Sequence, residues 1–145
     1  MLTLAVALLP LQDAPAAAPP PSGTGAPPMV VVDERDTMRQ EPTPHGNIGI
    51  STAYRISDAA PQPRTMEFRK RILPPGAAIG LHPIAHDEVY YVLSGEGEVT
   101  SDGVTKKMGP ATAAYLYDGA VVGIRQTGSA PLVLIISYPV KAAKD

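Results

Sequence analysis

The sequence predicts an all-β domain built as an antiparallel sandwich or barrel. Short segments alternate apolar and polar side chains with a period of two, as residues 66–73 do, and this period indicates a half-buried strand. Glycine, proline and aspartate turn signals separate these segments. No window longer than about ten residues has a convincing helical periodicity. A series of short strands with turns at this spacing is typical of all-β sandwiches and barrels.

The N-terminal half of the domain contains three expected strands. The first is the β-branched run at residues 30–32, and the second is residues 48–56, where alternate positions are apolar. The third, residues 66–73, places Met66, Phe68 and Ile72 on one face and charged residues on the other. The basic residues expected on solvated strand faces are Arg69, Lys70, Arg71 and Arg125.

The C-terminal half contains the remaining expected strands. Residues 88–93 form one strand, and the sequence Ser-Gly-Glu-Gly at 94–97 then makes a tight turn. An Asp-Gly pair at 102–103 predicts a hairpin between two short strands. The hairpin and the last three strands occupy residues 98–101, 104–108, 111–117, 120–126 and 132–138.

The 145 residues are enough for one domain, which we expect at residues 29–145. Residues 1–18 are predicted to be a signal peptide, because an apolar run is followed by A-x-A sequences, although no basic residue precedes Arg35. Residues 19–28 are rich in proline and predict a disordered linker. We therefore expect export to the periplasm or the medium, with a cytoplasmic location as the alternative. The apolar run is about half the ~20 residues that a membrane span needs, so no span is expected in the mature protein.

Composition excludes several classes of function. The net charge is −2 and no basic run exceeds three residues, which argues against a nucleic-acid-binding surface. The chain has no cysteine, so a disulfide framework, a thiolate zinc site and a cysteine nucleophile are all excluded. The motifs of serine hydrolases, zinc proteases and phosphate-binding loops are absent from the sequence.

The densest group of chemically active residues is His-Pro-Ile-Ala-His-Asp-Glu at 82–88. On one extended strand, His82, Ile84, His86 and Glu88 project to the same face. Two imidazoles and a carboxylate would then lie on one side of the sheet, although the proline at 83 makes the position of His82 less regular.

The segment from Pro75 to Gly97 resembles the first conserved motif of the cupin superfamily, in which a glycine follows the motif's glutamate by seven residues, as Gly95 follows Glu88. The family's second motif is matched more loosely, by Gly-Pro at 109–110, Gln-Thr-Gly at 126–128 and Pro-Leu at 131–132. The resemblance covers roughly residues 66–138. It implies a double-stranded β-helix, that is, a jelly-roll barrel of six to eight strands, with a small-molecule pocket inside.

The resemblance also implies a metal site, and this chain departs from it at two ligand positions. His82 and Glu88 stand where family members have ligands, but Ile84 and Val122 stand where two further histidines are typical. His86 could replace one lost ligand, and His45 is the only other imidazole in the chain. Two histidines and one carboxylate are the set used for non-haem iron, so a divalent first-row metal remains a candidate cofactor. The alternative is a pair of hydrogen-bonded histidines at the mouth of the barrel.

Two functional hypotheses follow, and whether the protein is an enzyme stays open between them. The first is a binding or structural cupin that holds a small-molecule ligand beside a degenerate metal site. The second is a metal-dependent enzyme, using iron, manganese, nickel or zinc, such as a dioxygenase, isomerase or lyase acting on a small oxygenated compound. The pocket-lining candidates are Ile84, Tyr90, Tyr115, Tyr117 and Val122. By analogy with small cupins that exchange an N-terminal strand, we expect a homodimer, with the strand supplied by residues 30–56.

Overall fold

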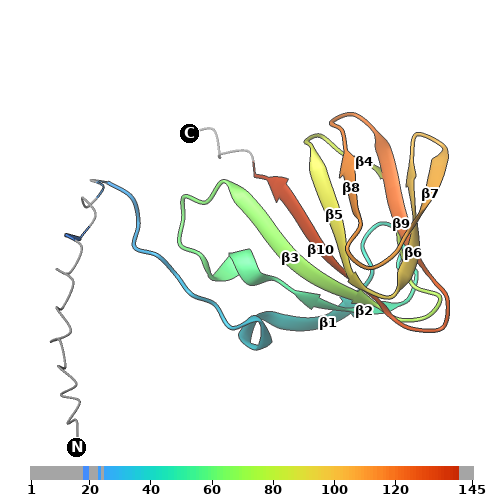
Figure 1. Ribbon diagram of the computed structural model, residues 1–145, viewed down its shortest axis with the longest axis horizontal. Coiled ribbons are helices and arrows are strands. Elements are labelled where there is room, and N and C mark those ends of the chain that lie inside the picture. The colour runs from blue at the N-terminus through green and yellow to red at the C-terminus, as the bar shows by residue number, and fades with distance from the viewer. Residues whose placement is uncertain (1–17, 20–22, 24, 141–145) are drawn as a thin grey trace, which may run out of the picture.

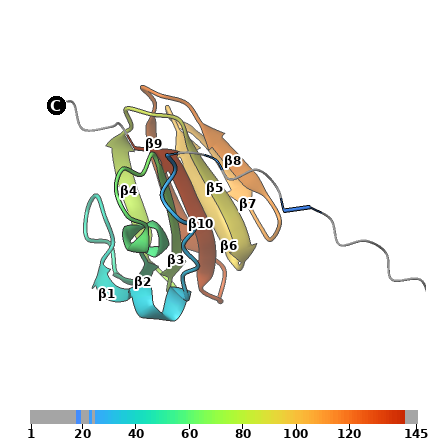
Figure 2. The ribbon, with the colours of Figure 1, turned by 90° about the vertical axis from the view of Figure 1, so that its left-hand side faces the viewer.

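The computed structural model describes residues 18–19, 23 and 25–140. The expected signal peptide and part of the expected linker therefore lie outside the described residues. Residues 25–33 have no regular secondary structure and lead as an arm into the folded body, which contains all the strands (Figure 1; Figure 2).

Ten strands and two short 3₁₀ helices make up this body. The helices are η1 (Glu34–Thr37) and η2 (Ile56–Ala59). The strands are β1 (Met38–Pro42), β2 (Ile50–Tyr54), β3 (Met66–Leu73), β4 (Ala78–Pro83), β5 (Glu88–Ser94), β6 (Glu96–Ser101), β7 (Val104–Met108), β8 (Ala113–Leu116), β9 (Val121–Thr127) and β10 (Leu132–Pro139).

The strands form two antiparallel sheets, which confirms the all-β jelly-roll fold. One sheet has six strands in the order β1-β2-β3-β10-β5-β8, and the other has four in the order β4-β9-β6-β7. We expected a closed barrel, but in the described part of the chain no strand ladder joins the two sheets. An isolated bridge between Ile48 and Ala78, together with a hydrogen bond from Gly80 N–H to Pro44 O at 3.3 Å, links the chain ahead of β2 to β4. The chain instead passes between sheets through loops, so the fold is an open sandwich.

The core lies between the sheets and follows from the alternation along the strands. In β10, Leu132, Leu134 and Ile136 are buried, and the residues between them point outward. β10 lies in the middle of its sheet, between β3 and β5, and its leucines and isoleucines suit a pleated strand covered on one face. The buried apolar cluster draws on both sheets, with Val122 and Ile124 contributed by β9.

Several predicted strands are confirmed and others are corrected. The hairpin between β6 and β7 is confirmed, with positive φ angles at Asp102 and Gly103 that fit a type I′ turn. The strand expected at residues 30–32 is wrong, because these residues pair with no other strand and Val31 is exposed. β1 was not expected, since its sequence Met-Arg-Gln-Glu-Pro lacks the residues that favour strands and is ordered by pairing with β2.

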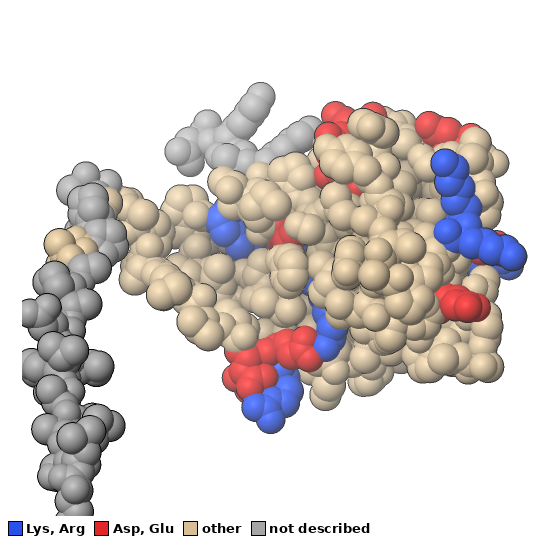
Figure 3. All heavy atoms as spheres, viewed as in Figure 1, with Lys and Arg blue, Asp and Glu red and all other residues tan. Residues whose placement is uncertain are grey.

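Charged side chains are scattered over the visible surface. In the space-filling view, Lys and Arg stand in separate small groups, some beside Asp or Glu (Figure 3). That face presents no continuous basic surface. Within the described residues, no helix is long and apolar enough to cross a membrane.

Candidate functional site

A cavity of about 440 Å³ opens between the two sheets. It is lined by ten polar or aromatic residues and by six smaller or apolar ones, including Ile79, Ile84 and Ile136. The polar and aromatic lining residues are Glu41, His45, Arg55, Arg69, Arg71, His82, His86, Glu88, Tyr90 and Tyr138. All three histidines of the chain therefore meet at one cavity.

His82 lies near the end of β4, and both its ring face and one ring nitrogen are occupied. Its Nδ1 lies 2.8 Å from the carbonyl oxygen of Gly80, which can only accept, so Nδ1 carries the proton. Its ring stacks on that of His45, with centroids 3.5 Å apart and planes 7° from parallel. When the ring is neutral, this tautomer makes Nε2 an acceptor for a hydrogen bond from a ligand.

His45 reaches this stack from an unusual loop. His45, Gly46 and Asn47 all have positive φ angles, a conformation that costs free energy for residues other than glycine. The loop can approach β4 because Gly80 has no side chain: a Cβ at Gly80 would lie 1.6 Å from the carbonyl oxygen of His45. Burial and the neighbouring His82 lower the pKa of His45, which favours a neutral ring.

Glu88 is the first residue of β5 and is almost completely buried. Burial raises its pKa to about 7, and the nearby cation of Arg69 opposes this rise. Its nearest imidazole is His86, whose Nε2 lies 3.6 Å from a carboxylate oxygen of Glu88, beyond hydrogen-bond distance. The ring of His86 stacks on Tyr138, with centroids 4.5 Å apart. Glu88 is thus a carboxyl group that changes protonation near neutral pH.

Two arginines that we expected in solvent instead face the interior. Arg69 and Arg71 alternate along β3 with Leu73, which is fully buried, so all three point into the sandwich. Arg71, 5% exposed, donates hydrogen bonds to Ser51 Oγ at 2.6 Å and to Glu41 at 2.8 Å. Lys70 is also largely buried, on the opposite face of β3, whereas Arg125 is exposed as expected.

The two interior arginines belong to two separate ion-pair groups. Glu41 accepts from both Arg71 and Arg55, the latter at 2.7 Å. Glu67 accepts from Arg69 at 3.1 Å and also from Arg64 and Ser57. Burial alone would raise the pKa of Glu67, but these hydrogen bonds outweigh it and lower the pKa to about 2. Glu41 is thus shared by two cations, which leaves a net positive charge at the cavity, whereas Arg64 also pairs with Asp58 and balances the charges around Glu67.

The expectation that residues 82–88 form one extended strand is wrong. β4 ends at Pro83, the chain turns over residues 84–87, and β5 begins at Glu88 in the other sheet. The turn is held where Ile84 N–H donates to Ala120 O and Gly119 N–H donates to Ile84 O, both at 3.0 Å. His82 and Glu88 still line the same cavity, because the cavity lies between the sheets that they come from.

The other sequence-predicted pocket residues divide into two groups. Ile84 and Tyr90 line the cavity. Val122 is fully buried opposite His82 in the β4–β9 ladder, but it lies in the core and not at the cavity. Tyr115 and Tyr117 are exposed on β8 and just beyond it, because they alternate with the buried Leu116 and so point outward.

The donor set does not fit a metal site as it is arranged. Among the residues that the structure describes, no three His, Cys, Asp or Glu side chains lie close enough to hold one ion. His82 is stacked on His45, and His86 is directed at Glu88 rather than sharing a centre with His82. As arranged in the structure, these side chains therefore do not form a metal centre.

Comparison with known proteins agrees with this architecture. The cupin-domain family model matches residues 70–138. The chain is 30% identical over 112 residues to a Thermotoga maritima protein named "Oxalate-binding protein", covering 76% of this chain and 90% of that protein. The chain therefore belongs to the cupin family.

Solved structures support the same fold. A predicted oxalate decarboxylase from Thermotoga maritima matches with a TM-score of 0.63 and 23% identity, covering 77% of this chain and 99% of that one. The polyketide cyclase RemF from Streptomyces resistomycificus matches with a TM-score of 0.67 and 17% identity, covering 80% of this chain and 82% of that one. At these identities the likeness concerns the fold alone.

Sequence reasoning missed the arginines and Glu41 as cavity residues. Glu41, Arg55 and Arg69 precede the segment that the family model matches. The one signal available was the alternation in β3, which places Arg69 and Arg71 on the same face as Leu73.

Proposed function

We propose that this protein binds a small organic anion, with one or more carboxylate groups, in the cavity between its sheets. The observation that carries the proposal is the charge of the lining, where three arginines face two glutamates and one of the arginines, Arg69, is also paired with Glu67. Glu41 is shared between Arg55 and Arg71, and the raised pKa of Glu88 leaves it partly uncharged at neutral pH. A partly enclosed lining with a small excess of positive charge favours an anion, because charge interactions are stronger where water is partly excluded.

Arg69 is the arginine best suited to contact the anion. It is bonded to Glu67 through Nε only, which leaves its two terminal nitrogens for a ligand, and it lies near Glu88. The free Nε2 atom of His82 adds an acceptor for a hydroxyl or a protonated carboxyl group. The apolar side chains of Ile79, Ile84 and Ile136 would cover the carbon skeleton.

The name of the Thermotoga maritima relative supports the carboxylate class. The cavity of about 440 Å³ is much larger than oxalate, which has only a few heavy atoms, and lies in the range of about 300–1,000 Å³ typical of small-molecule pockets. A larger dicarboxylate or a carboxylate with a hydroxylated chain fits the volume better.

Titration calorimetry with oxalate, malonate and succinate tests the proposal. The wild-type protein should bind at least one of them, and Arg69→Gln should weaken that binding by about tenfold or more, the worth of one charged hydrogen bond. Arg125→Gln is the matched control, because Arg125 is exposed on the other sheet, and it should bind as the wild type does. Absence of binding by the wild type, or an equal loss in both variants, would refute the proposal.

A metal-dependent enzyme is the second candidate, because all three histidines and Glu88 line one cavity. Rearrangement of His82 and His86 around an ion would be needed to form the site. Elemental analysis of protein purified without chelator separates the candidates: near-stoichiometric iron, manganese, nickel or zinc that is lost in Glu88→Ala supports the enzyme. Persistent absence of metal after soaking counts against it.

Two further proposals concern the location of the protein and its oligomeric state. Export is supported by the apolar leader and its A-x-A sequences, and is tested by fractionating cells that express the full chain. A homodimer is supported by the exposed apolar residues at the N-terminal side of the domain, such as Met29 and Val31. Light scattering that finds only monomer at micromolar concentration would contradict it.

A further inference from the structure

We propose that the ligand of the cavity is a dicarboxylate as long as glutarate or adipate, held at one end by Arg69 and at the other by Arg71. This assignment rests on the proposed function, because it concerns the same cavity and specifies which carboxylates it selects. It is carried by the position of the two arginines, which lie two residues apart on the inner face of β3 and both line the cavity.

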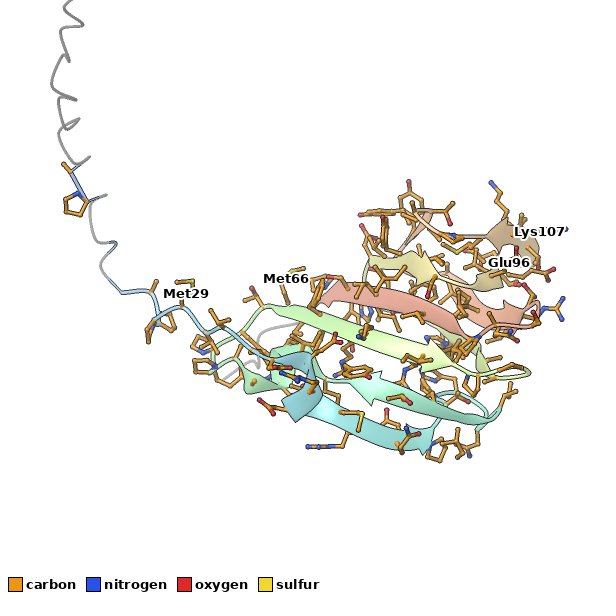
Figure 4. All side chains as sticks on the ribbon, turned by 60° about the horizontal axis from the view of Figure 1, so that its bottom comes forward. Met29, Met66, Glu96 and Lys107 are labelled. Atoms are coloured by element: carbon orange, nitrogen blue, oxygen red, sulfur yellow. The ribbon has the colours of Figure 1, made fainter. Side chains whose placement is uncertain are left out.

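The inner face of the six-stranded sheet is organised in rows that run across β3, β10 and β5. The strand registers place one row at Arg69, Ile136 and Tyr90. They place the next row, farther from the start of β3, at Arg71, Leu134 and Val92. β3 starts with Met66 at the end of the body nearer Met29, and Glu96 and Lys107 lie towards the opposite end (Figure 4).

The cavity ends at the row that contains Arg71. Leu134 and Val92 in this row are fully buried and do not line the cavity. The next inward pair, Leu73 and Leu132, belongs to the apolar core. Arg71 is thus the last charged side chain on the inner face of β3, and a charge at this depth is costly unless other groups balance it.

The charge of Arg71 is balanced only in part. Its guanidinium donates to Ser51 and to Glu41, but Glu41 also pairs with Arg55, so two cations share one carboxylate. A guanidinium has five N–H groups, and these two bonds leave the other three without an acceptor among the described residues. A ligand carboxylate beside Arg71 would supply both the missing negative charge and the missing acceptors.

The row that contains Arg69 offers a second set of donors. Arg69 bonds to Glu67 through Nε only, so its terminal nitrogens remain available to a ligand. Tyr90 is 1% exposed and lines the cavity, yet its hydroxyl makes no hydrogen bond with the part of the chain that the structure describes. A buried tyrosine hydroxyl usually has a partner, so an oxygen atom of the ligand is the expected one.

The spacing of the two arginines sets the length of the ligand. Residues two apart on a strand are separated by about 7 Å. Arg69 bonds back to Glu67, whereas Arg71 reaches Ser51. Ser51 lies beyond Ala53, the β2 partner of Arg71, on the side away from Arg69, so the two head groups lean apart. Oxalate and malonate are too short to bridge them, and extended glutarate or adipate comes close to this span.

The lining beside the two sets of donors suits a chain of methylene groups. Ile136 pairs with Arg69 across the sheet and lines the cavity from β10. Ile79 lines it from β4 in the other sheet. Methylene groups between these side chains leave water for an apolar contact, which adds to the affinity of the longer acids.

Titration calorimetry of the wild-type protein with oxalate, malonate, glutarate and adipate tests this selection. Glutarate or adipate should bind at least about tenfold more tightly than oxalate and malonate, because only the longer acids reach both arginines. Pentanoate has the length of glutarate but a single carboxylate group. It should bind at least about tenfold more weakly than glutarate, because it leaves one arginine without a ligand.

Arg71→Lys separates the contributions of the two ends. The lysine keeps the positive charge and lacks the fixed fork of N–H groups that binds a carboxylate. It should weaken glutarate binding by about tenfold and malonate binding by less, so the preference for the longer acid should shrink. Arg69→Gln should weaken the binding of both acids. Arg125→Gln is the matched control, since Arg125 is exposed on the other sheet, and it should bind every acid as the wild type does.

The failure of this proposal differs from that of the proposed function. If the wild type binds none of the acids, both are overturned. If oxalate or malonate binds as tightly as glutarate and adipate, or pentanoate as tightly as glutarate, carboxylate binding stands and the two-ended arrangement is overturned. Circular dichroism establishes whether Arg71→Lys is folded, and the acid series on the wild type decides the question even if it is not.

Discussion

Glu88 combines burial with a position at the cavity, and this has a consequence for stability. Its folded-state pKa of about 7 lies above the ordinary value of 4.5, so the folded protein retains a proton that the unfolded chain has released in this interval. The stabilisation is complete below pH 4.5 and is lost as the pH rises through about 7. The loss amounts to about 3 kcal/mol.

We therefore expect Glu88→Gln to flatten the pH dependence of stability. Urea denaturation at pH 5 and pH 8 should show that the wild type loses more stability between these values than the variant does, by roughly 2 kcal/mol, because part of the effect is already lost at pH 5. The glutamine keeps the shape but cannot ionise. Equal pH dependence in the two proteins would mean that Glu88 is not the buried titrating group.

The same residue links pH to binding. As the pH rises through 7, Glu88 becomes a carboxylate in a cavity proposed to hold an anion, and like charges repel. The affinity for a fully ionised dicarboxylate should thus fall across this range in the wild type and change less in Glu88→Gln.

Among the elements, the loop at residues 43–47 has the conformation most sensitive to a single substitution. Its approach to β4 depends on the absence of a side chain at Gly80, where a Cβ would overlap the carbonyl oxygen of His45. Three successive positive φ angles hold the loop in a conformation that it would leave if displaced.

Gly80→Ala is expected to move this loop and separate His45 from His82. Carboxylate affinity should fall. The NMR signals of both imidazoles should also shift, because each ring loses the ring-current contribution that the other makes to its chemical shifts. Gly109→Ala is the control, since a Cβ at Gly109 meets no atom within 4 Å and its φ is not positive. Unchanged imidazole signals in Gly80→Ala would show that the loop does not depend on this contact.

The strands show how far local pattern determines structure. Alternation located β3, β5 and β10 and the Asp-Gly pair located the β6–β7 hairpin, because these signals are local. Alternation in β3 separates two faces but does not say which is inside, and the charges of Arg69 and Arg71 pointed to the wrong one. The sequence of β1 carries no local strand signal. Its extended conformation depends on its pairing with β2.

The candidate site was predictable only in part for the same reason. His82, His86, Glu88 and His45 were named from sequence, and they line one cavity. Their arrangement depends on the turn at residues 84–87, which moves the chain from one sheet to the other and which the periodicity of a single strand does not reveal. Glu41 and Arg55 come from a distant part of the chain, and only the packing of β1 and β2 brings them to the cavity.

At the scale of the whole molecule, the two sides of the six-stranded sheet have different side chains. The inner side supplies Arg69, Arg71, Glu88 and Tyr90 to the cavity, and the outer side carries exposed residues such as Tyr91. The alternation of β3 and β5 produces both sides, because successive residues point to opposite faces of the sheet. Substitutions on the outer side should leave the cavity intact, so Tyr91→Glu should still bind the carboxylate in titration calorimetry.

A crystal structure of the protein soaked with malonate tests the central claim most directly. The account predicts malonate between the two sheets, with one carboxylate group within hydrogen-bond distance of the Arg69 guanidinium. A cavity that stays free of malonate at saturating concentration, or one in which His82, His86 and Glu88 converge on a metal ion instead, would contradict it.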